Sequence, residues 1–92
     1  MEEKSVKMNI SGHVQGVFFR ANTRDKARQL DLKGWVKNLS NGDVEIFAQG
    51  SRKNLEQLKK WARKGPPRAR VDEVRTQEEQ TKEGLKDFKI RY

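Results

Sequence analysis

Apolar and polar residues alternate near the start of the chain, where Val6, Met8 and Ile10 are separated by polar side chains. This period of two indicates a half-buried β-strand. Further strands are predicted over residues 34–39, 43–49, 70–76 and 88–92, and the polar run 77–84 is expected to be a solvated loop. The pair Asn41-Gly42 predicts a tight hairpin with both residues at positive φ.

Two segments change from the strand period to the helical period. A helix is predicted over residues 20–31, with an apolar stripe formed by Phe19, Thr23, Ala27 and Leu30. A second helix is predicted to begin after Ser51, a good N-cap, and to end at Gly65, which two prolines follow. Its apolar stripe is formed by Leu55, Leu58, Trp61 and Ala62.

The resulting order predicts an α+β fold, a ferredoxin-like βαββαβ sandwich with a short extra C-terminal strand. Two helices then cover one face of an antiparallel sheet, and residues 1–92 form a single domain. In this arrangement the first two strands lie parallel on either side of the third, so both end at the same edge of the sheet. The loop after the first strand is therefore expected to meet Asn38, which shares a strand face with Val36.

That loop reads GHVQGVFFR, from Gly12 to Arg20. Its two glycines permit positive φ and can turn successive N–H groups to one side, which makes a concavity that binds anions at a helix N-terminus. Arg20 falls in the first helical turn, where a cation opposes the helix dipole by about 0.3–1 kcal/mol and a bound phosphate or carboxylate would remove the conflict. Phe18 and Phe19 are expected to anchor the loop to the core. A plain glycine turn followed by a solvated arginine would give the same pattern, and no nucleotide-binding glycine motif matches.

The amino-acid composition limits which ligands and catalytic groups the protein can use. Lys plus Arg is 21 against 13 Asp plus Glu, a net charge of +8 that attracts phosphorylated small molecules, nucleic acids or acidic membranes. The absence of cysteine excludes disulfides, thiol nucleophiles and cysteine-bound metals. No signal-peptide pattern or membrane-spanning apolar run is present in the 92 residues, so a cytoplasmic protein is expected.

Two long motifs give the chain a specific resemblance. Residues 12–20 fit G-x-V-Q-G-V-x-F-R at every fixed position, and residues 34–44 fit G-[aromatic]-V-x-N-x-x-x-G-x-V. In these motifs, and over almost its whole length, the chain resembles the acylphosphatase family. The resemblance implies hydrolysis of acyl phosphates to a carboxylate and inorganic phosphate. It also implies that Asn38 orients the attacking water and that the phosphoryl group is bound by Arg20 and the loop amides of Gln15, Gly16, Val17, Phe18 and Phe19.

An acyl phosphate suits a site with few reactive side chains. Its leaving group departs as a stable carboxylate without a general acid, so catalysis can rest on positioning and charge. We expect a substrate oxygen to accept the proton of the water, without metal, cofactor or covalent intermediate. Thr23 is expected to support the loop through its hydroxyl or to pack in the core, and the variable His13 to face solvent. Many family members have glycine in place of Phe18, where an unusual backbone angle would cost stability.

Two other functions compete with hydrolysis. RNA-recognition domains share this fold plan, and Phe47 on the open face of the central strand could stack on a base. The aromatic run that such domains carry is absent from the sequence. A regulatory module could instead bind a small anion at the same loop without turnover. The partner expected from the resemblance is a small acyl phosphate, with no membrane or obligate protein partner, and the protein is expected to be a monomer.

Overall fold

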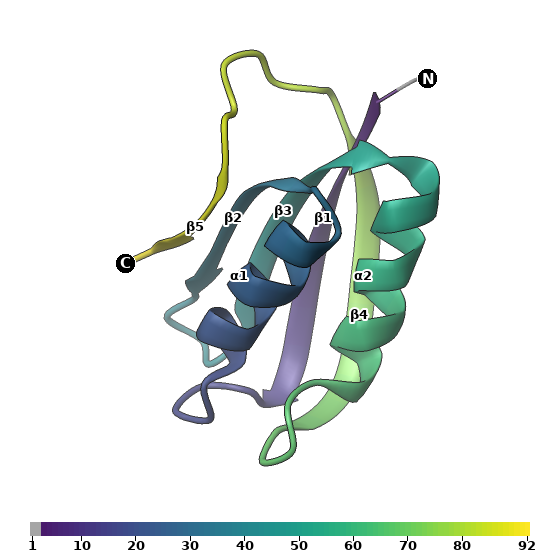
Figure 1. The fold of residues 1–92 in the computed structure, drawn as a ribbon. Coiled ribbons are helices and arrows are strands. Elements are labelled where there is room, and N and C mark those ends of the chain that lie inside the picture. The colour runs from purple at the N-terminus through teal and green to yellow at the C-terminus, as the bar shows by residue number, and fades with distance from the viewer. Residues whose placement is uncertain (1–2) are drawn as a thin grey trace.

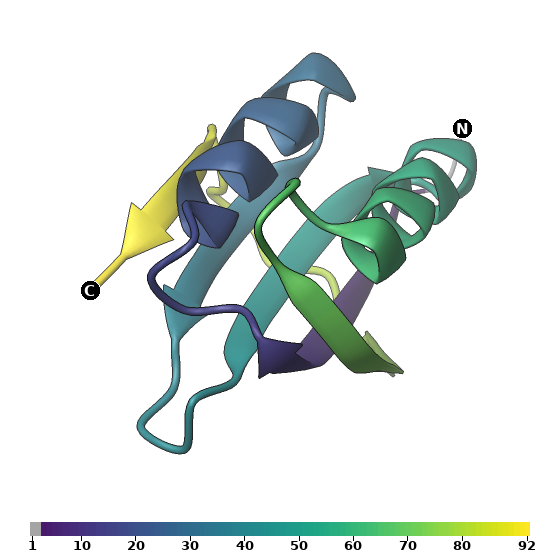
Figure 2. The same ribbon diagram turned by 90° about the horizontal axis from the view of Figure 1, so that it is seen from below.

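The computed structural model describes residues 3–92 and places two helices against one face of a five-stranded sheet (Figure 1). The elements are β1 (Glu3–His13), α1 (Phe19–Gln29), β2 (Lys33–Asn38), β3 (Val44–Ser51), α2 (Arg52–Lys64), β4 (Arg70–Glu79) and β5 (Phe88–Arg91). Seen along the sheet in Figure 2, both helices lie on the same side and no helix covers the other side. The predicted ferredoxin-like α+β fold is confirmed. No helix among residues 3–92 is long and apolar enough to cross a membrane.

The strands follow the order β4-β1-β3-β2-β5. Both β1 and β2 pair with β3 in antiparallel fashion, so these two strands run parallel and end at the same edge, as the sequence predicted. β4 is also antiparallel to its neighbour β1. The short extra strand β5 pairs with β2 in parallel, so the complete sheet is mixed rather than purely antiparallel.

β4 is longer than its sequence pattern predicted. It continues to Glu79, where its last residues pair with Ser5 and Val6 of β1, so the expected loop over 77–84 begins only after this strand. The extension is polar because β4 lies at the edge of the sheet, where charged side chains also discourage pairing with other chains. Backbone pairing with the long strand β1, rather than burial, therefore sets the length of β4.

α1 ends at Gln29, two residues before the predicted boundary. Asp31 has a φ of 56°, and its N–H donates to the Arg28 carbonyl at 3.1 Å. The Leu32 N–H donates to the Ala27 carbonyl at 2.9 Å, which completes a Schellman motif around a left-handed residue that is usually glycine. An aspartate at this position gives little sequence signal of a helix end.

The β2–β3 hairpin forms where Asn41-Gly42 predicted it, but its turn type differs. Gly42 has a φ of 95°, whereas Asn41 is not among the residues with positive φ. The Gly42 N–H donates to the Leu39 carbonyl at 3.2 Å and the Leu39 N–H to the Asp43 carbonyl at 2.8 Å. This is a three-residue loop with a glycine bulge, in which only one residue needs positive φ. The Asn41 side chain instead accepts from the Asp43 N–H at 3.0 Å.

The core lies between the helices and the sheet. It is lined from β1, β2 and β3 by Met8, Ile10, Val36, Val44, Ile46 and Ala48, and from the helices by Phe19, Ala27, Leu55, Leu58 and Ala62. Phe19 at the start of α1 packs against Trp61 of α2, with ring centres 5.6 Å apart. The loop after β1 is thus attached to the core at the point where α1 begins.

The open face of the sheet carries a covered aromatic pair. Phe47 lies there as predicted, but it is only 1% exposed. Trp35 stacks on it with ring centres 4.5 Å apart, and the Lys82 ammonium lies 5.5 Å from its ring centre. Phe47 is therefore not available as a platform for a nucleic-acid base, which removes the observation that favoured RNA binding.

Gly12 is required where β1 leaves the sheet. Its φ is 126°, and a Cβ atom there would lie 2.1 Å from the Arg70 carbonyl oxygen and 2.8 Å from the Asp72 nitrogen. Both contacts are backbone atoms of β4 at the register shift between Ser11 and Gly12. The close approach of β4 thus fixes the direction in which the chain enters the loop.

We expect Gly12→Ala to destabilise the protein by about 2–4 kcal/mol, since backbone strain and overpacking add at this position. Chemical denaturation would measure the change in the free energy of unfolding. Gly84→Ala is the matched control, because Gly84 also has a positive φ, 82°, but nothing lies within 4 Å of its Cβ position. Equal losses in the two variants would show that strain alone, and not the approach of β4, makes glycine necessary.

Candidate active site

The loop between β1 and α1 has the bent backbone that the glycines predicted. Gly16 has a φ of 75° and Gly12 one of 126°. Phe18 is the N-cap of α1 with a φ of 63°, and no side chain caps the helix. The first N–H groups of a helix have no partner within the helix, so this N-terminus leaves donors available at the end of the loop. Phe18 thus has the unusual backbone angle that was expected to cost stability at this position.

The residues of the loop differ in how they contact the core. Val17 is 6% exposed and Phe19 1%, so both anchor the loop. Phe18 is 74% exposed, and its predicted role as an anchor is wrong. The left-handed backbone of Phe18 turns its side chain away from the neighbours on either side. His13, at the end of β1, is exposed as predicted.

Arg20 lies in the first turn of α1, where no acidic residue accompanies it. The ion pairs found among residues 3–92 involve other basic residues. Its guanidinium carbon lies 5.0 Å from the ring centre of Tyr92, which follows β5. The conflict between this cation and the helix dipole is therefore not relieved by a carboxylate from the described part of the chain.

Asn38 ends β2 and lines the same cavity as Arg20 and the loop, which the strand arrangement predicted it to meet. Its Oδ1 atom is buried and accepts no hydrogen bond from any group in residues 3–92. A buried polar atom without a partner costs about 1–3 kcal/mol, and folded proteins rarely leave one. Within residues 3–92, Asn38 therefore gains no stabilising hydrogen bond through this oxygen.

These groups share one cavity of about 280 Å³. Its lining combines the loop and the start of α1 with the ends of β2 and β5: Val14, Gly16, Phe18, Phe19, Arg20, Ala21, Asn38, Ile90 and Tyr92. The structure thus brings together Arg20, Asn38 and three of the five predicted loop residues. Gln15 and Val17 belong to the same loop but do not line the cavity.

Gln15 makes a contact that the sequence analysis missed. Its Nε2 donates to the Leu39 carbonyl at 2.8 Å and to the Asp43 carbonyl at 2.9 Å. The side chain thereby joins the loop to the β2–β3 hairpin, directly beyond Asn38. Its fixed place in the G-x-V-Q-G motif was the available signal, although only its backbone amide was considered.

Two other contacts hold the elements around the cavity. The buried Thr23 hydroxyl donates to the Phe19 carbonyl at 2.7 Å, so it supports the first turn of α1 and also packs in the core. Asp87 forms an ion pair with Arg28 of α1 at 2.9 Å, which ties the start of β5 to that helix. The Phe88 N–H, which donates to the carboxylate, and the Arg28 guanidinium hold the pKa of Asp87 below its ordinary value, against an opposing effect of desolvation.

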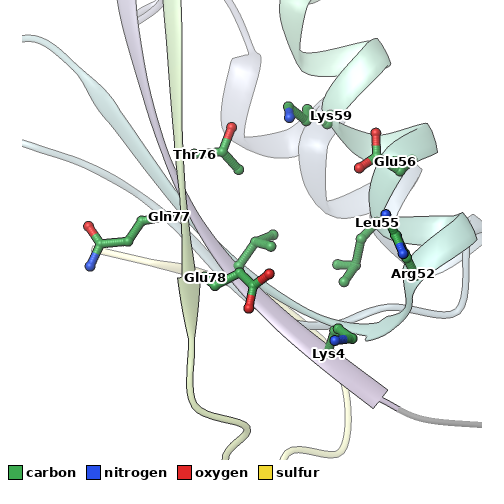
Figure 3. Close-up of a pocket in the computed structure, with 9 residues that line it drawn as sticks. Lys4, Arg52, Leu55, Glu56, Lys59, Thr76, Gln77 and Glu78 are labelled. Atoms are coloured by element: carbon green, nitrogen blue, oxygen red, sulfur yellow. The ribbon is translucent and has the colours of Figure 1, made fainter.

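A second cavity, of about 300 Å³, lies between α2 and β4 (Figure 3). Three cations and two carboxylates surround it: Lys4, Arg52, Lys59, Glu56 and Glu78. It contains no residue of the loop and no counterpart of the buried free acceptor of Asn38. Within residues 3–92, no three His, Asp or Glu side chains are grouped closely enough to hold a metal ion. The cavity at Arg20 is therefore the candidate active site.

The fold and this cavity define a ferredoxin-like domain with a cationic site at a helix N-terminus. The sequence matches the family model for acylphosphatase over residues 6–90. An acylphosphatase from Rubrobacter xylanophilus is 42% identical over 90 residues, covering 98% of this chain and 82% of that protein. An acylphosphatase structure from Coxiella burnetii superposes with a TM-score of 0.92 at 46% identity, covering 97% of this chain and 93% of that chain. The chain belongs to the acylphosphatase family.

A second solved structure is equally similar in fold. The crystal structure of acylphosphatase from Bacillus subtilis superposes with a TM-score of 0.93 at 34% identity, covering 97% of this chain and 99% of that chain. The chain thus has nearly the same extent as this relative, and the elements that carry the cavity fall within the shared fold.

Proposed function

We propose that this chain hydrolyses the carboxyl–phosphate bond of acyl phosphates to a carboxylate and inorganic phosphate. The observation that carries the proposal is that Asn38 lines the cavity that holds Arg20, although no hydrogen bond within residues 3–92 engages its buried Oδ1. A water molecule held by the Asn38 side chain in this cavity would lie next to the phosphoryl group. Membership of the acylphosphatase family supports the same reaction.

The phosphoryl group would bind at the start of α1. Arg20 offers a planar fork of donors and a full positive charge to its oxygens. The backbone N–H groups of the loop supply further donors from Gln15, Gly16, Val17, Phe18 and Phe19. Binding an anion here satisfies the helix N-terminus and removes the conflict between Arg20 and the helix dipole. Arg20 and the loop N–H groups thus both bind the phosphoryl group of the substrate and stabilise the charge that develops on it in the transition state.

Asn38 would place the attacking water in line with the phosphorus atom. The water oxygen forms a bond to phosphorus while the bond between phosphorus and the acyl oxygen breaks, and the electron pair leaves on the carboxylate. One proton of the water passes to a phosphoryl oxygen, so no protein base is needed. A carboxylate leaves as a stable anion, and neither a general acid nor a covalent intermediate is required. Positioning and charge stabilisation supply the rate enhancement.

Gln15 has a positioning role in this proposal. Gln15→Ala removes two hydrogen bonds that join the loop to the hairpin beyond Asn38. We expect kcat to fall about tenfold, because a small displacement between the loop and Asn38 misaligns the water and the phosphoryl group. Gln15→Glu is a stringent companion variant, since it keeps the shape but replaces the donor by an acceptor facing two carbonyl oxygens. Unchanged kcat in both variants would show that the loop keeps its position without this side chain.

Steady-state hydrolysis of benzoyl phosphate in the presence of excess chelator tests the function directly. We expect turnover that is unaffected by the chelator and inhibited competitively by inorganic phosphate. Phosphate binding without product release would favour the module that binds a small anion. No turnover by folded protein, with or without added divalent metal, would refute the proposed reaction.

We also propose that the protein works as a monomer in the cytoplasm. Among residues 3–92, the exposed large apolar side chains lie at the cavity and do not form a separate face that a stable dimer would bury. A sequence without cysteine gains nothing from an oxidising compartment. Light scattering at working concentrations and localisation of a tagged chain would test the two statements separately.

A further inference from the structure

Two large apolar side chains are exposed within residues 3–92, and both belong to the candidate active site. Phe18 is 74% exposed and Tyr92 is 99% exposed. Both line the cavity that holds Arg20 and Asn38. Single exposed apolar residues are ordinary on a protein surface, but two aromatic rings at one polar cavity are the composition of a small-molecule site.

The two rings come from different parts of the fold. Phe18 is the N-cap of α1, and Tyr92 directly follows β5. β5 is held beside β2 by parallel pairing and against α1 by the ion pair of Asp87 with Arg28. Tyr92 also lies next to the proposed phosphate ligand, with its ring centre 5.0 Å from the Arg20 guanidinium carbon. Each ring thus stands on a residue directly adjacent to a helix or strand of the fold.

Phe18 occupies its place against the backbone preference of its residue type. At a φ of 63°, a bulky side chain is strained, and glycine would avoid this strain. The ring gains little from burial in return, because most of it is exposed. Strain without a stabilising contact is typical of positions that serve binding.

The second cavity offers a comparison within the same molecule. It is of similar size, but its lining combines charged and polar side chains with Val6 and Leu55 and contains no aromatic ring (Figure 3). Leu55 is 5% exposed and belongs to the core. A further hollow at Pro66 and Pro67 includes Trp61, but that ring is only partly exposed. Among residues 3–92, the two large apolar rings that are exposed both line the cavity with Arg20.

We infer that Phe18 and Tyr92 form an apolar seat for the acyl group of the substrate, so that the site favours aromatic or bulky apolar acyl phosphates over short aliphatic ones. This inference rests on the proposed function. Once the phosphoryl group occupies the loop and Arg20, the acyl group is left at the part of the cavity where the exposed rings stand. An aromatic acyl group gains contact with both rings, whereas an acetyl group is too small to bury much apolar area.

The ratio of kcat/KM for benzoyl phosphate to that for acetyl phosphate tests the seat. We expect Phe18→Gly and Tyr92→Ala each to lower this ratio about five- to tenfold, mainly through the KM for benzoyl phosphate. Effects on the loop or on Arg20 act on both substrates and cancel in the ratio. Phe18→Tyr and Tyr92→Phe are the matched controls, because each keeps the ring, and both should keep the ratio of the wild type. Circular dichroism would verify that every variant is folded.

A ratio that does not change in Phe18→Gly and Tyr92→Ala would overturn the inference, even if both rates fell. A fall of the ratio in the ring-retaining controls would overturn it too. If the wild type hydrolysed acetyl phosphate with no preference for benzoyl phosphate, the seat would be refuted and the proposed function would stand. If the wild type hydrolysed neither substrate, the proposed function itself would fail.

Discussion

Arg20→Ala is expected to lower kcat/KM for benzoyl phosphate by at least about a hundredfold, the scale on which loss of one charge-stabilising donor acts. The side chain lies at the N-terminus of α1 without an acidic partner among residues 3–92, in the cavity that also holds Asn38. Its charge and its pair of donors are therefore available to the phosphoryl group. Removing them should weaken both binding of the substrate and stabilisation of the transition state, so KM should rise as kcat falls.

Arg24→Ala is the matched control for this variant. Arg24 lies one turn further along α1, where it is paired with Asp25 at 3.0 Å. Its removal changes the net charge by the same amount but leaves the cavity intact, so activity should stay within about twofold because exposed ion pairs contribute little. Arg20→Lys should fall between the two, since it keeps the charge and loses the planar fork.

Phosphate-dependent thermal stability separates binding from turnover. A ligand that binds only the folded state raises the melting temperature, by an amount that grows with the logarithm of its concentration relative to Kd. Inorganic phosphate should therefore stabilise the wild type and Arg24→Ala, but not Arg20→Ala. If Arg20→Ala remained as strongly stabilised by phosphate as the wild type, the assignment of Arg20 as the phosphoryl ligand would be wrong.

The meeting of Arg20 and Asn38 could be predicted from the sequence because it depends on strand direction and pleat. The predicted ferredoxin-like order places the strands around Met8 and Val36 parallel to each other, on either side of a third strand. Both strands therefore end at the same edge of the sheet. Hydrophobic periodicity and turn residues are local features of a few residues, so they can be read from the sequence without the tertiary structure. The predicted end of α2 at Gly65 was correct for the same reason.

The errors fall where local sequence signals are weak or conflict. Phe18 stands between two buried residues, and no periodicity in a loop distinguishes it from them; its left-handed backbone is what exposes it. Gln15 bonds to carbonyl groups 24 and 28 residues away, a contact that depends on the final approach of the hairpin. The end of β4 follows from pairing with β1 and not from its own polar sequence. Each of these features is decided by tertiary structure.

Asn38→Ala is expected to separate catalysis from both binding and stability. We expect kcat to fall on the order of a hundredfold or more, because the attacking water loses the side chain that aligns it with phosphorus. Inhibition by inorganic phosphate should stay within about twofold of the wild type, since Arg20 and the loop amides remain. This pattern is the opposite of that expected for Arg20→Ala, in which binding is lost as well.

The stability of Asn38→Ala provides an independent test of the same role. No hydrogen bond of the Asn38 side chain is found within residues 3–92, and its Oδ1 is buried without a donor, so the substitution removes an unfavourable group. We therefore expect an unchanged or higher midpoint of thermal unfolding together with the loss of turnover. An asparagine kept for structure would give the reverse result, with a lower midpoint and activity that falls only as the protein unfolds. The combination of a more stable fold and an inactive site would identify Asn38 as a residue that is retained for catalysis and not for stability.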